Sequence, residues 1–256
     1  MKRNIVLHYL ILTFAIMLVS WGSCVIAGYY GITQDNNLLM YIPYLVGGFS
    51  PTIASYVVLK KHGRVSGFKQ WLRTIFNVKA PVRYYIFVVA MCALFVLTNV
   101  LLSGMEELKP LYLILLYLPV MLVGGGLEEA GWRYVLSPEL DRKYGFVLSS
   151  VITGVIWAAW HIPLFFMPDT TQNSRDFWLF SISVMGFAFA LGAIRQITDN
   201  VFLCVFFHCL INAVTGVIIF NQTFVGIALS TGIVIAVSLV AYYRHKKHCK
   251  EGIVNV

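Results

Sequence analysis

The chain has 256 residues, of which 59% are hydrophobic and 12% are charged, and its mean hydropathy is +0.78. Soluble domains are about 45–50% apolar and about 25% charged, so this composition excludes a soluble globular protein. The formal net charge of +8 does not indicate a nucleic-acid partner, because the basic residues lie between apolar runs. We expect a protein whose main partner is the lipid bilayer.

Eight apolar runs approach the roughly 20 residues that a helix needs to cross a bilayer. They cover about residues 5–28, 38–59, 84–103, 111–136, 146–167, 177–194, 201–220 and 224–243. The first run is longer than the apolar core of a cleaved signal peptide, so a retained helix is expected. The sequence predicts an all-α integral membrane protein, a bundle of about eight transmembrane helices in a single domain over residues 1–256.

The basic residues indicate the orientation of these spans. When the chain is threaded alternately through the membrane, 17 of its 19 lysines and arginines fall on one side, and only Lys109 and Arg175 fall on the other. Cytoplasmic loops of membrane proteins carry an excess of lysine and arginine. Both termini are therefore predicted to lie in the cytoplasm.

The second loop, residues 60–83, is predicted to form an amphipathic helix on the inner membrane surface. Its apolar residues recur every three or four positions, with Lys69 and Arg73 between them. Such a helix buries its apolar face at the interface and holds its cations near anionic lipid headgroups. The apolar positions are Phe68, Trp71, Leu72, Ile75 and Phe76.

The fourth run contains three charged residues, Glu128, Glu129 and Arg133. A charged side chain at the centre of a membrane helix costs about 2.5–3.5 kcal/mol on insertion scales, so such residues are usually paired and functional. Glu129 and Arg133 are four residues apart and can pair on one helix face. Glu128 then faces elsewhere. The preceding glycines, Gly124 to Gly126, permit close packing or a break beside a wet cavity.

Polar side chains also mark one face of each of two later runs. Helical periodicity places the members of each set on one face, and polar groups in a bilayer turn toward the bundle interior. We therefore expect Glu128, His161, His208 and Asn212 to converge. The two sets are Ser150, Thr153, Trp157 and His161 in the fifth run, and His208, Asn212 and Thr215 in the seventh.

This set of side chains suits the hydrolysis of an amide bond. The reaction needs a base that activates water and donors that stabilise the oxyanion; Glu128 with His161 fits the first need, and His208 with Asn212 fits the second. Three other readings remain open: charges that only hold helices together, a zinc site with Glu128, His161 and His208 as ligands, and a proton-coupled transporter. No inverted pair of broken helices supports the last.

Three motifs resemble those of the CAAX prenyl endopeptidase and Abi (CPBP) family of glutamate-type intramembrane proteases. Glu128-Glu129-Ala-Gly-Trp-Arg133 is similar to the family's E-E-x-x-x-R, Trp157-Ala-Ala-Trp-His161 lies where the family has F-x-x-x-H, and His208-Cys-Leu-Ile-Asn212 matches H-x-x-x-N. The motifs occur in the family's order, within a core of about residues 110–220.

The resemblance implies an eight-helix intramembrane endopeptidase, without a cofactor, whose site opens toward the cytoplasm. It implies that Glu128 and His161 activate water and that His208 and Asn212 stabilise the oxyanion. Glu129 and Arg133 are supporting motif positions. The chain departs from the family at Trp157, where phenylalanine is usual and the larger ring is expected to reshape the substrate slot, and at Tyr134, where many members carry glycine.

The resemblance also implies the kinds of substrate. Members of the family trim prenylated C-a-a-X tails, and others are tied to the maturation of bacteriocins or peptide pheromones. A membrane-associated or lipidated peptide is therefore the expected partner, and no nucleic acid is. Some relatives are linked to bacteriocin self-protection, so a non-proteolytic immunity or scaffold protein is the alternative.

The predicted spans leave one geometric conflict. At about 1.5 Å per helical residue, Glu128 lies ~12 Å and His208 ~10 Å from the predicted inner ends of their helices, whereas His161 lies ~22 Å from the start of a straight helix at residue 146. A later start, a tilt, or kinks at the glycines or Pro163 must bring His161 to the level of the others.

Overall fold

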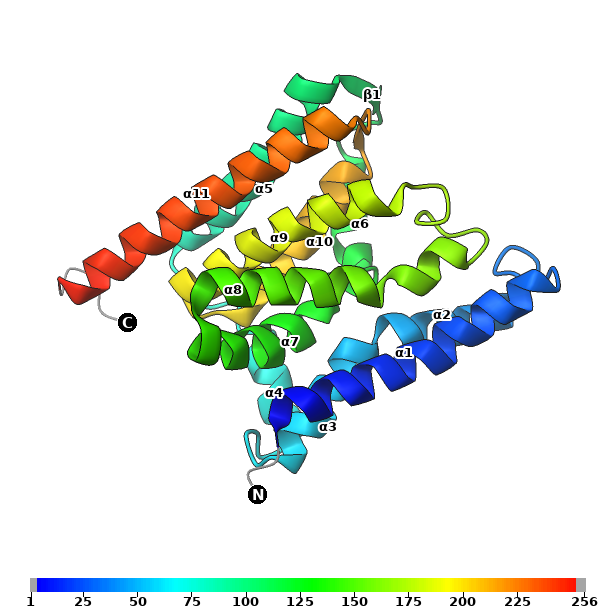
Figure 1. The fold of residues 1–256 in the computed structure, drawn as a ribbon, viewed down its shortest axis with the longest axis horizontal. Helices are drawn as coiled ribbons and strands as arrows, with labels where there is room; N and C mark the ends of the chain where they lie inside the picture. Colours follow the sequence, from blue (N-terminus) through cyan, green and yellow to red (C-terminus); the bar gives the residue numbers. More distant parts are fainter. Residues whose placement is uncertain (1–3, 252–256) are drawn as a thin grey trace.

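A computed structural model describes residues 4–251 (Figure 1). The chain is helical nearly throughout, as its composition predicts, and long helices cross the molecule side by side. The elements, with short 3-10 or π turns labelled η, are α1 (Ile5–Tyr29), η1 (Leu38–Met40), α2 (Tyr41–Gly48), α3 (Ser50–Lys61), α4 (Phe68–Ile75), α5 (Val82–Ser103), β1 (Met105–Leu108), α6 (Leu113–Val123), η2 (Gly126–Glu128), α7 (Glu129–Gly131), η3 (Trp132–Leu136), α8 (Ser137–Trp160), η4 (Ile162–Phe166), α9 (Phe177–Thr198), α10 (Val201–Thr215), β2 (Ile218–Phe220) and α11 (Phe224–Lys250).

The all-α prediction missed one small feature. Two short strands, β1 and β2, form an antiparallel pair in which Met105 faces Phe220 and Leu108 faces Ile218. The strands join the segment after α5 to the segment after α10. The two strands have only four and three residues and lie beside long apolar runs. Segments this short show no alternation of apolar and polar residues from which a strand could be predicted.

Among residues 4–251, five helical segments are long and apolar enough to cross a bilayer, and a sixth span is possible if α2 and α3, which are bent by 47° at their junction, act together. The helices α6 and α10 are apolar but shorter. The structure therefore supports a helical membrane protein with several spans, while the count of eight stays a prediction. In the second loop, α4 buries Trp71 and Ile75 and exposes Lys69 and Arg73, which confirms the amphipathic helix.

One of the five segments, Gly126–Phe166, is a hairpin rather than one straight helix. Its chain reverses at Gly145, whose φ of 75° lies in the left-handed region that favours glycine. The arms are antiparallel, because the Ser149 hydroxyl donates to the Ser137 carbonyl near the turn and the Trp157 indole donates to Glu128 far from it.

The hairpin removes the conflict in depth. Glu128 lies 17 residues before Gly145, and His161 lies 16 residues after it, so the two residues sit at the same level of the two arms. The chain stays helical beyond residue 136, the predicted end of the fourth span, and continues through η3 and α8 to the turn. Charged residues, among them Arg142 and Lys143, lie near the turn and are exposed.

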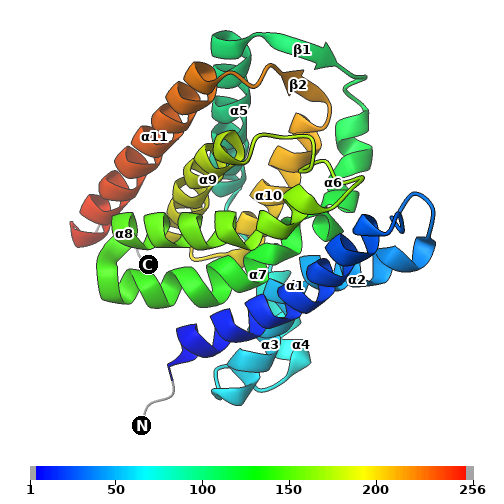
Figure 2. The same ribbon diagram turned by 45° about the vertical axis from the view of Figure 1, so that its right-hand side comes forward.

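The connections between helices gather at two ends of the bundle. At one end, which we call the terminal pole, the Asn200 side chain donates to the Asn77 carbonyl (2.9 Å), and Arg64 lies 3.6 Å from Glu139. This pole holds the start of α1, the end of α11, and the connections 62–67, 76–81, 145 and 199–200. Figure 2 shows the start of α1 and the end of α11 on this side.

The opposite end, the distal pole, holds the connections 30–37, 104–112, 167–176 and 216–223. The strands β1 and β2 tie two of these connections together. The Gln34 side chain contacts the Met167 sulfur at 3.5 Å and ties the other two. Figure 2 places β1 and β2 on the opposite side from the start of α1 and the end of α11.

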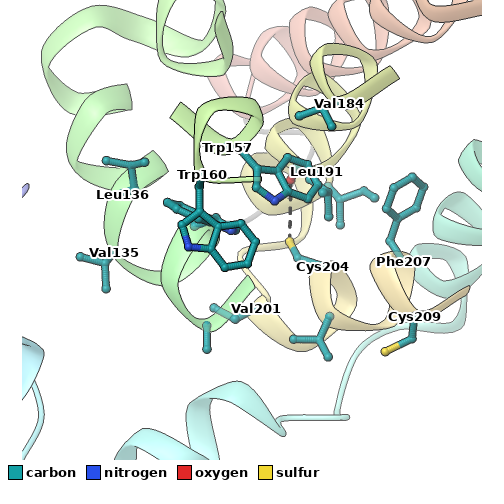
Figure 3. Packing of buried hydrophobic residues seen from close by; sticks show 14 of the residues in the cluster. Val135, Leu136, Trp157, Trp160, Val184, Leu191, Val201, Cys204, Phe207 and Cys209 are labelled. Atoms are coloured by element: carbon teal, nitrogen blue, oxygen red, sulfur yellow. Dashed lines mark hydrogen bonds between the residues drawn. The ribbon is translucent and has the colours of Figure 1, made fainter. Parts of the chain in front are cut away.

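Between the poles, the hairpin packs against α9 and α10 through buried aromatic and aliphatic side chains (Figure 3). Trp160 packs against Trp132, with ring centroids 5.8 Å apart, and the Cys204 thiol of α10 donates to the Leu191 carbonyl of α9 at 3.7 Å. α9 begins at Asp176, whose carboxylate accepts two backbone N–H groups, and α10 begins at Asn200, whose side chain accepts one. These caps fix the ends of the helices around the cavity described next.

Candidate active site

A cavity of about 510 Å³ lies among the helices, and all four residues expected to converge line it. Glu128 ends η2, His161 follows the last turn of α8, and His208 and Asn212 lie one turn apart on α10. They come from three different parts of the chain, as the polar stripes predict. A cavity of this size, with apolar walls and a few polar groups, is typical of a small-ligand or peptide site.

Glu128 is held by two indole rings. The Trp157 N–H donates to Glu128 Oε2 at 2.8 Å, and the Trp132 N–H donates to the same oxygen at 3.3 Å. No side chain or backbone group among residues 4–251 hydrogen-bonds the other oxygen, Oε1. The side chain is 8% exposed and lines the cavity. One oxygen is therefore fixed, and the second is available to a molecule in the cavity.

His161 is oriented by its own helix. Its Nδ1 lies 2.8 Å from the Trp157 carbonyl oxygen, which can only accept a hydrogen bond. Nδ1 therefore carries the hydrogen, and in the neutral ring Nε2 keeps its lone pair. The ring packs edge-on against Trp160 and Phe180, with centroids 4.7 and 4.9 Å away. This packing fixes the plane of the imidazole.

Glu129 connects Arg133 to His208. Its Oε2 lies 3.0 Å from Arg133 Nε, and both side chains are fully buried. Its Oε1 lies 2.9 Å from His208 Nδ1. A carboxylate accepts, so the hydrogen on Nδ1 points to Glu129, and His208 Nε2 is the nitrogen left for other partners. The pairing of Glu129 with Arg133 follows from their spacing, whereas the contact with His208 has no signal in the sequence.

Arg133 has a second set of contacts that keeps it in place. Its Nη1 donates to the Ser137 hydroxyl at 3.0 Å, and its guanidinium carbon lies 5.6 Å from the centroid of the Trp157 ring. Arg195 donates to the Arg133 carbonyl at 3.1 Å. The buried cation is thus paired, hydrogen-bonded and covered by an aromatic face, the conditions under which a charge is tolerated in a membrane interior.

Gly125 gives His208 and Asn212 their space. Its φ of 141° is one that side chains other than glycine rarely adopt. A Cβ atom here would lie 2.7 Å from Asn212 Nδ2 and 2.8 Å from His208 Nε2. The Asn212 amide donates to the Gly124 carbonyl at 3.2 Å. The break between α6 and η2 therefore brings backbone against both side chains, which explains the glycine at position 125.

Two residues of the site were missed from the sequence or misread. Trp132 was not singled out, although its spacing of four from Glu128 is the signal that could have found it. Trp157 was read as a bulky wall residue, but its indole N–H is a hydrogen-bond donor to Glu128, which phenylalanine cannot be. Tyr134 is half-buried and packs against the core.

The zinc reading does not fit the geometry. Among residues 4–251, no group of three or more histidine, cysteine, aspartate or glutamate side chains is placed to hold a metal ion. His208 turns Nδ1 toward Glu129, and Glu128 Oε2 is occupied by two indoles. Glu128, His161 and His208 surround a shared space without forming a ligand set.

The cavity belongs to the distal pole. Connecting segments of that pole contribute lining residues, among them Thr171, Gln172, Arg175 and Gln222, whereas the connections of the terminal pole contribute none. The prediction combined cytoplasmic termini with a site that opens toward the cytoplasm. Both statements stay predictions; the connections that line the cavity belong to the pole opposite the start of α1 and the end of α11.

Fold and site together define a helical membrane protein whose lipid-embedded interior holds a carboxylate, two imidazoles and a carboxamide around one cavity. Residues 110–214 match the family model described as "Type II CAAX prenyl endopeptidase Rce1-like". This segment contains every residue of the three motifs. The match confirms the resemblance of the chain to the CAAX prenyl endopeptidase family.

A curated relative extends the similarity beyond the motif region. CAAX prenyl protease 2 of Methanococcus maripaludis is 23% identical to this chain over 249 residues, which cover 88% of this chain and 87% of the relative. The similarity therefore extends well beyond residues 110–214, the segment that carries the motifs.

Proposed function

We propose that this protein is an intramembrane endopeptidase, which hydrolyses a peptide bond in a membrane-associated polypeptide with a water molecule activated by Glu128. The observation that carries the proposal is the environment of this carboxylate. It lies in a cavity wall within the bundle, two indoles hold one of its oxygens, and its other oxygen is unengaged. The similarity to CAAX prenyl endopeptidases supports the same reaction.

Glu128 and His161 would prepare the water. Glu128 Oε1 can accept one of its hydrogens, and the lone pair of His161 Nε2 can accept the other. Trp157 supports both groups, since its indole N–H holds Glu128 and its carbonyl holds His161 Nδ1. As the water oxygen attacks the scissile carbonyl carbon, its proton passes to Glu128, which can return it to the leaving amine.

His208 and Asn212 would stabilise the oxyanion that forms on the scissile carbonyl. Asn212 has an amide N–H beyond the one given to Gly124. His208 donates through Nε2 when the ring is doubly protonated, and the Glu129 carboxylate at Nδ1 stabilises that form. Glu129 and Arg133 act through His208, as positioning residues rather than as catalytic residues.

The substrate class proposed is a peptide held at the membrane, either a lipidated C-terminal tail of the C-a-a-X type or a peptide of the bacteriocin or pheromone type. We further propose eight spans, with the shorter helices α6 and α10 included, and both termini in the cytoplasm. The excess of lysine and arginine at the terminal pole supports this orientation.

The proposal is tested with purified protein reconstituted in liposomes that contain single-span reporter peptides, with new peptide ends identified by mass spectrometry. We expect cleavage by the wild type and none by the His161→Ala and Asn212→Ala variants. An immunity or scaffold protein would cleave nothing, and its protective phenotype in cells would survive both substitutions.

Trp157→Phe restores the residue usual in the family and removes one donor to Glu128. A hydrogen bond to a charged group contributes about 1.5–3 kcal/mol. Since Trp132 still holds the carboxylate, we expect kcat to fall by about tenfold, the lower end of this range, with KM little changed. Trp71→Phe is the matched control, because it removes an indole donor to the Ser55 hydroxyl at the terminal pole. Equal losses in both variants would show that Trp157 acts only through packing.

Removal of divalent metal is expected to leave cleavage unchanged. The base in this mechanism is a carboxylate, and the cavity residues form no metal-ligand set in the described chain. Rates are to be compared before and after dialysis against EDTA and 1,10-phenanthroline, with a zinc endopeptidase as the positive control. A loss that added Zn²⁺ restores would contradict the role given to Glu128.

A further inference from the structure

The charges at the two poles of the bundle differ strongly. Of the described lysines and arginines, fourteen lie in terminal-pole segments, and Arg133 is buried in the interior. Only Lys109 and Arg175 lie in the connections of the distal pole. These connections carry five carboxylates, Asp35, Glu106, Glu107, Asp169 and Asp176. The terminal pole thus has the charge pattern of a cytoplasmic face, and the distal pole does not.

The cavity reaches the distal pole through two connections that are distant in the sequence. Thr171, Gln172 and Arg175 line it from the segment between η4 and α9, and Ile218 and neighbouring residues line it from β2. β1 pairs with β2, so these walls belong to one structured rim rather than to loose loops. The charge pattern and the cavity therefore point to opposite sides of the membrane.

The rim contains a cation, Arg175, that no residue among 4–251 neutralises. Arg175 is exposed, lines the cavity, and its guanidinium makes no ion pair or hydrogen bond within residues 4–251. Asp176, its neighbour, is engaged by the backbone N–H groups of Trp178 and Leu179. A peptide that enters here meets a polar and cationic rim before it meets Glu128.

We propose that the substrate enters the cavity from the extracytoplasmic side, and that it is a polypeptide whose scissile bond emerges from the outer leaflet. This inference rests on the proposed endopeptidase function for the nature of the substrate, but not for the side of access. A cytoplasmic C-terminal tail would have to cross the bilayer to reach Glu128, so of the two substrate classes proposed above this inference selects the peptide of the bacteriocin or pheromone type.

The side of access is tested with two matched serine-to-cysteine variants in a Cys249→Ser background, because the other four native cysteines are buried. Ser174 is exposed at the rim of the cavity, and Ser66 is exposed in the 62–67 connection of the terminal pole. Spheroplasts of an expressing bacterium are treated with a membrane-impermeant maleimide. We expect Ser174→Cys to be labelled in intact spheroplasts and Ser66→Cys only after lysis; the reverse pattern would overturn the proposal.

The substrate class is tested in the same cells. One peptide segment is placed directly outside or directly inside the membrane anchor of a single-span reporter, and cleavage is compared between wild type and Glu128→Gln. We expect wild-type cleavage of the outer placement alone. Cleavage of the inner placement alone would overturn the proposal. If neither reporter placement is cleaved but Ser174→Cys is labelled from outside, the proposed endopeptidase function is contradicted and the extracytoplasmic side of access is supported.

Discussion

Gly125→Ala is expected to abolish peptide cleavage while the protein still inserts into the membrane. The new Cβ would lie within 2.8 Å of both Asn212 Nδ2 and His208 Nε2, so both proposed oxyanion donors must move. Loss of a single donor of this kind typically lowers kcat by about 10²–10³-fold. The φ of 141° adds backbone strain on the order of 1–3 kcal/mol for a residue with a Cβ. We expect kcat to fall at least ~10²-fold.

Gly124→Ala is the matched control, one residue away. Gly124 has an ordinary φ of −81°, and its Cβ would come no closer than 3.2 Å to the flexible Met121 side chain. We expect it to keep most of the activity. The initial rate on a reconstituted reporter peptide distinguishes the two variants, with membrane yield and thermal unfolding measured on the same preparations. Equal activity of the two variants would show that the space beside Gly125 is not needed for catalysis.

Glu128→Gln is expected to lower kcat by about 10²–10⁴-fold, the usual contribution of a general base. Glutamine keeps the shape of the side chain, and its carbonyl oxygen can still accept from Trp157 and Trp132. It cannot accept a proton from water and return it to the leaving group. Substrate binding, and therefore KM, should change little when binding precedes slow chemistry.

Glu139→Gln is the control for removal of a carboxylate. Glu139 pairs with Arg142 and Arg64 at the terminal pole, far from the cavity. Exposed ion pairs contribute little to stability, so its activity should match that of the wild type. If Glu139→Gln were as inactive as Glu128→Gln, activity would depend on the total negative charge of the protein and not on a general base in the cavity.

Local spacing predicted the parts of the site that depend on one helix. Glu129 and Arg133 are four residues apart and therefore share one helix face, where they pair. Glu128 is adjacent to Glu129 in the sequence and therefore faces a different direction. The convergence of Glu128, His161 and His208 around one cavity follows from the rule that polar groups in lipid face the interior.

The contacts between helices could not be predicted in the same way. The hydrogen bond from His208 to Glu129 joins residues 79 positions apart, and that from Trp157 to Glu128 joins residues 29 positions apart. Each depends on the rotation of one helix against another, which helical periodicity does not define. The same holds for Gly125, whose role appears only when His208 and Asn212 are placed beside it.

The level of His161 shows how one boundary can mislead. Glu139, Arg142 and Lys143 suggested that the fourth span ends at residue 136, whereas the helical arm runs on to the turn at Gly145. Counting from that turn places Glu128 and His161 at equal depth and places the cavity toward the distal pole. The relative level of Glu128 and His161 therefore depends on a turn at a single glycine, which follows a group of charged residues.

The central claim is that water, activated by Glu128, cleaves a peptide bond within the membrane. The most direct measurement is mass spectrometry of peptides released in proteoliposomes prepared in H₂¹⁸O. Wild type is expected to release a fragment with one ¹⁸O atom in its new carboxyl terminus, and Glu128→Gln is expected to release none. The same labelled fragment at the same rate from Glu128→Gln would contradict the claim.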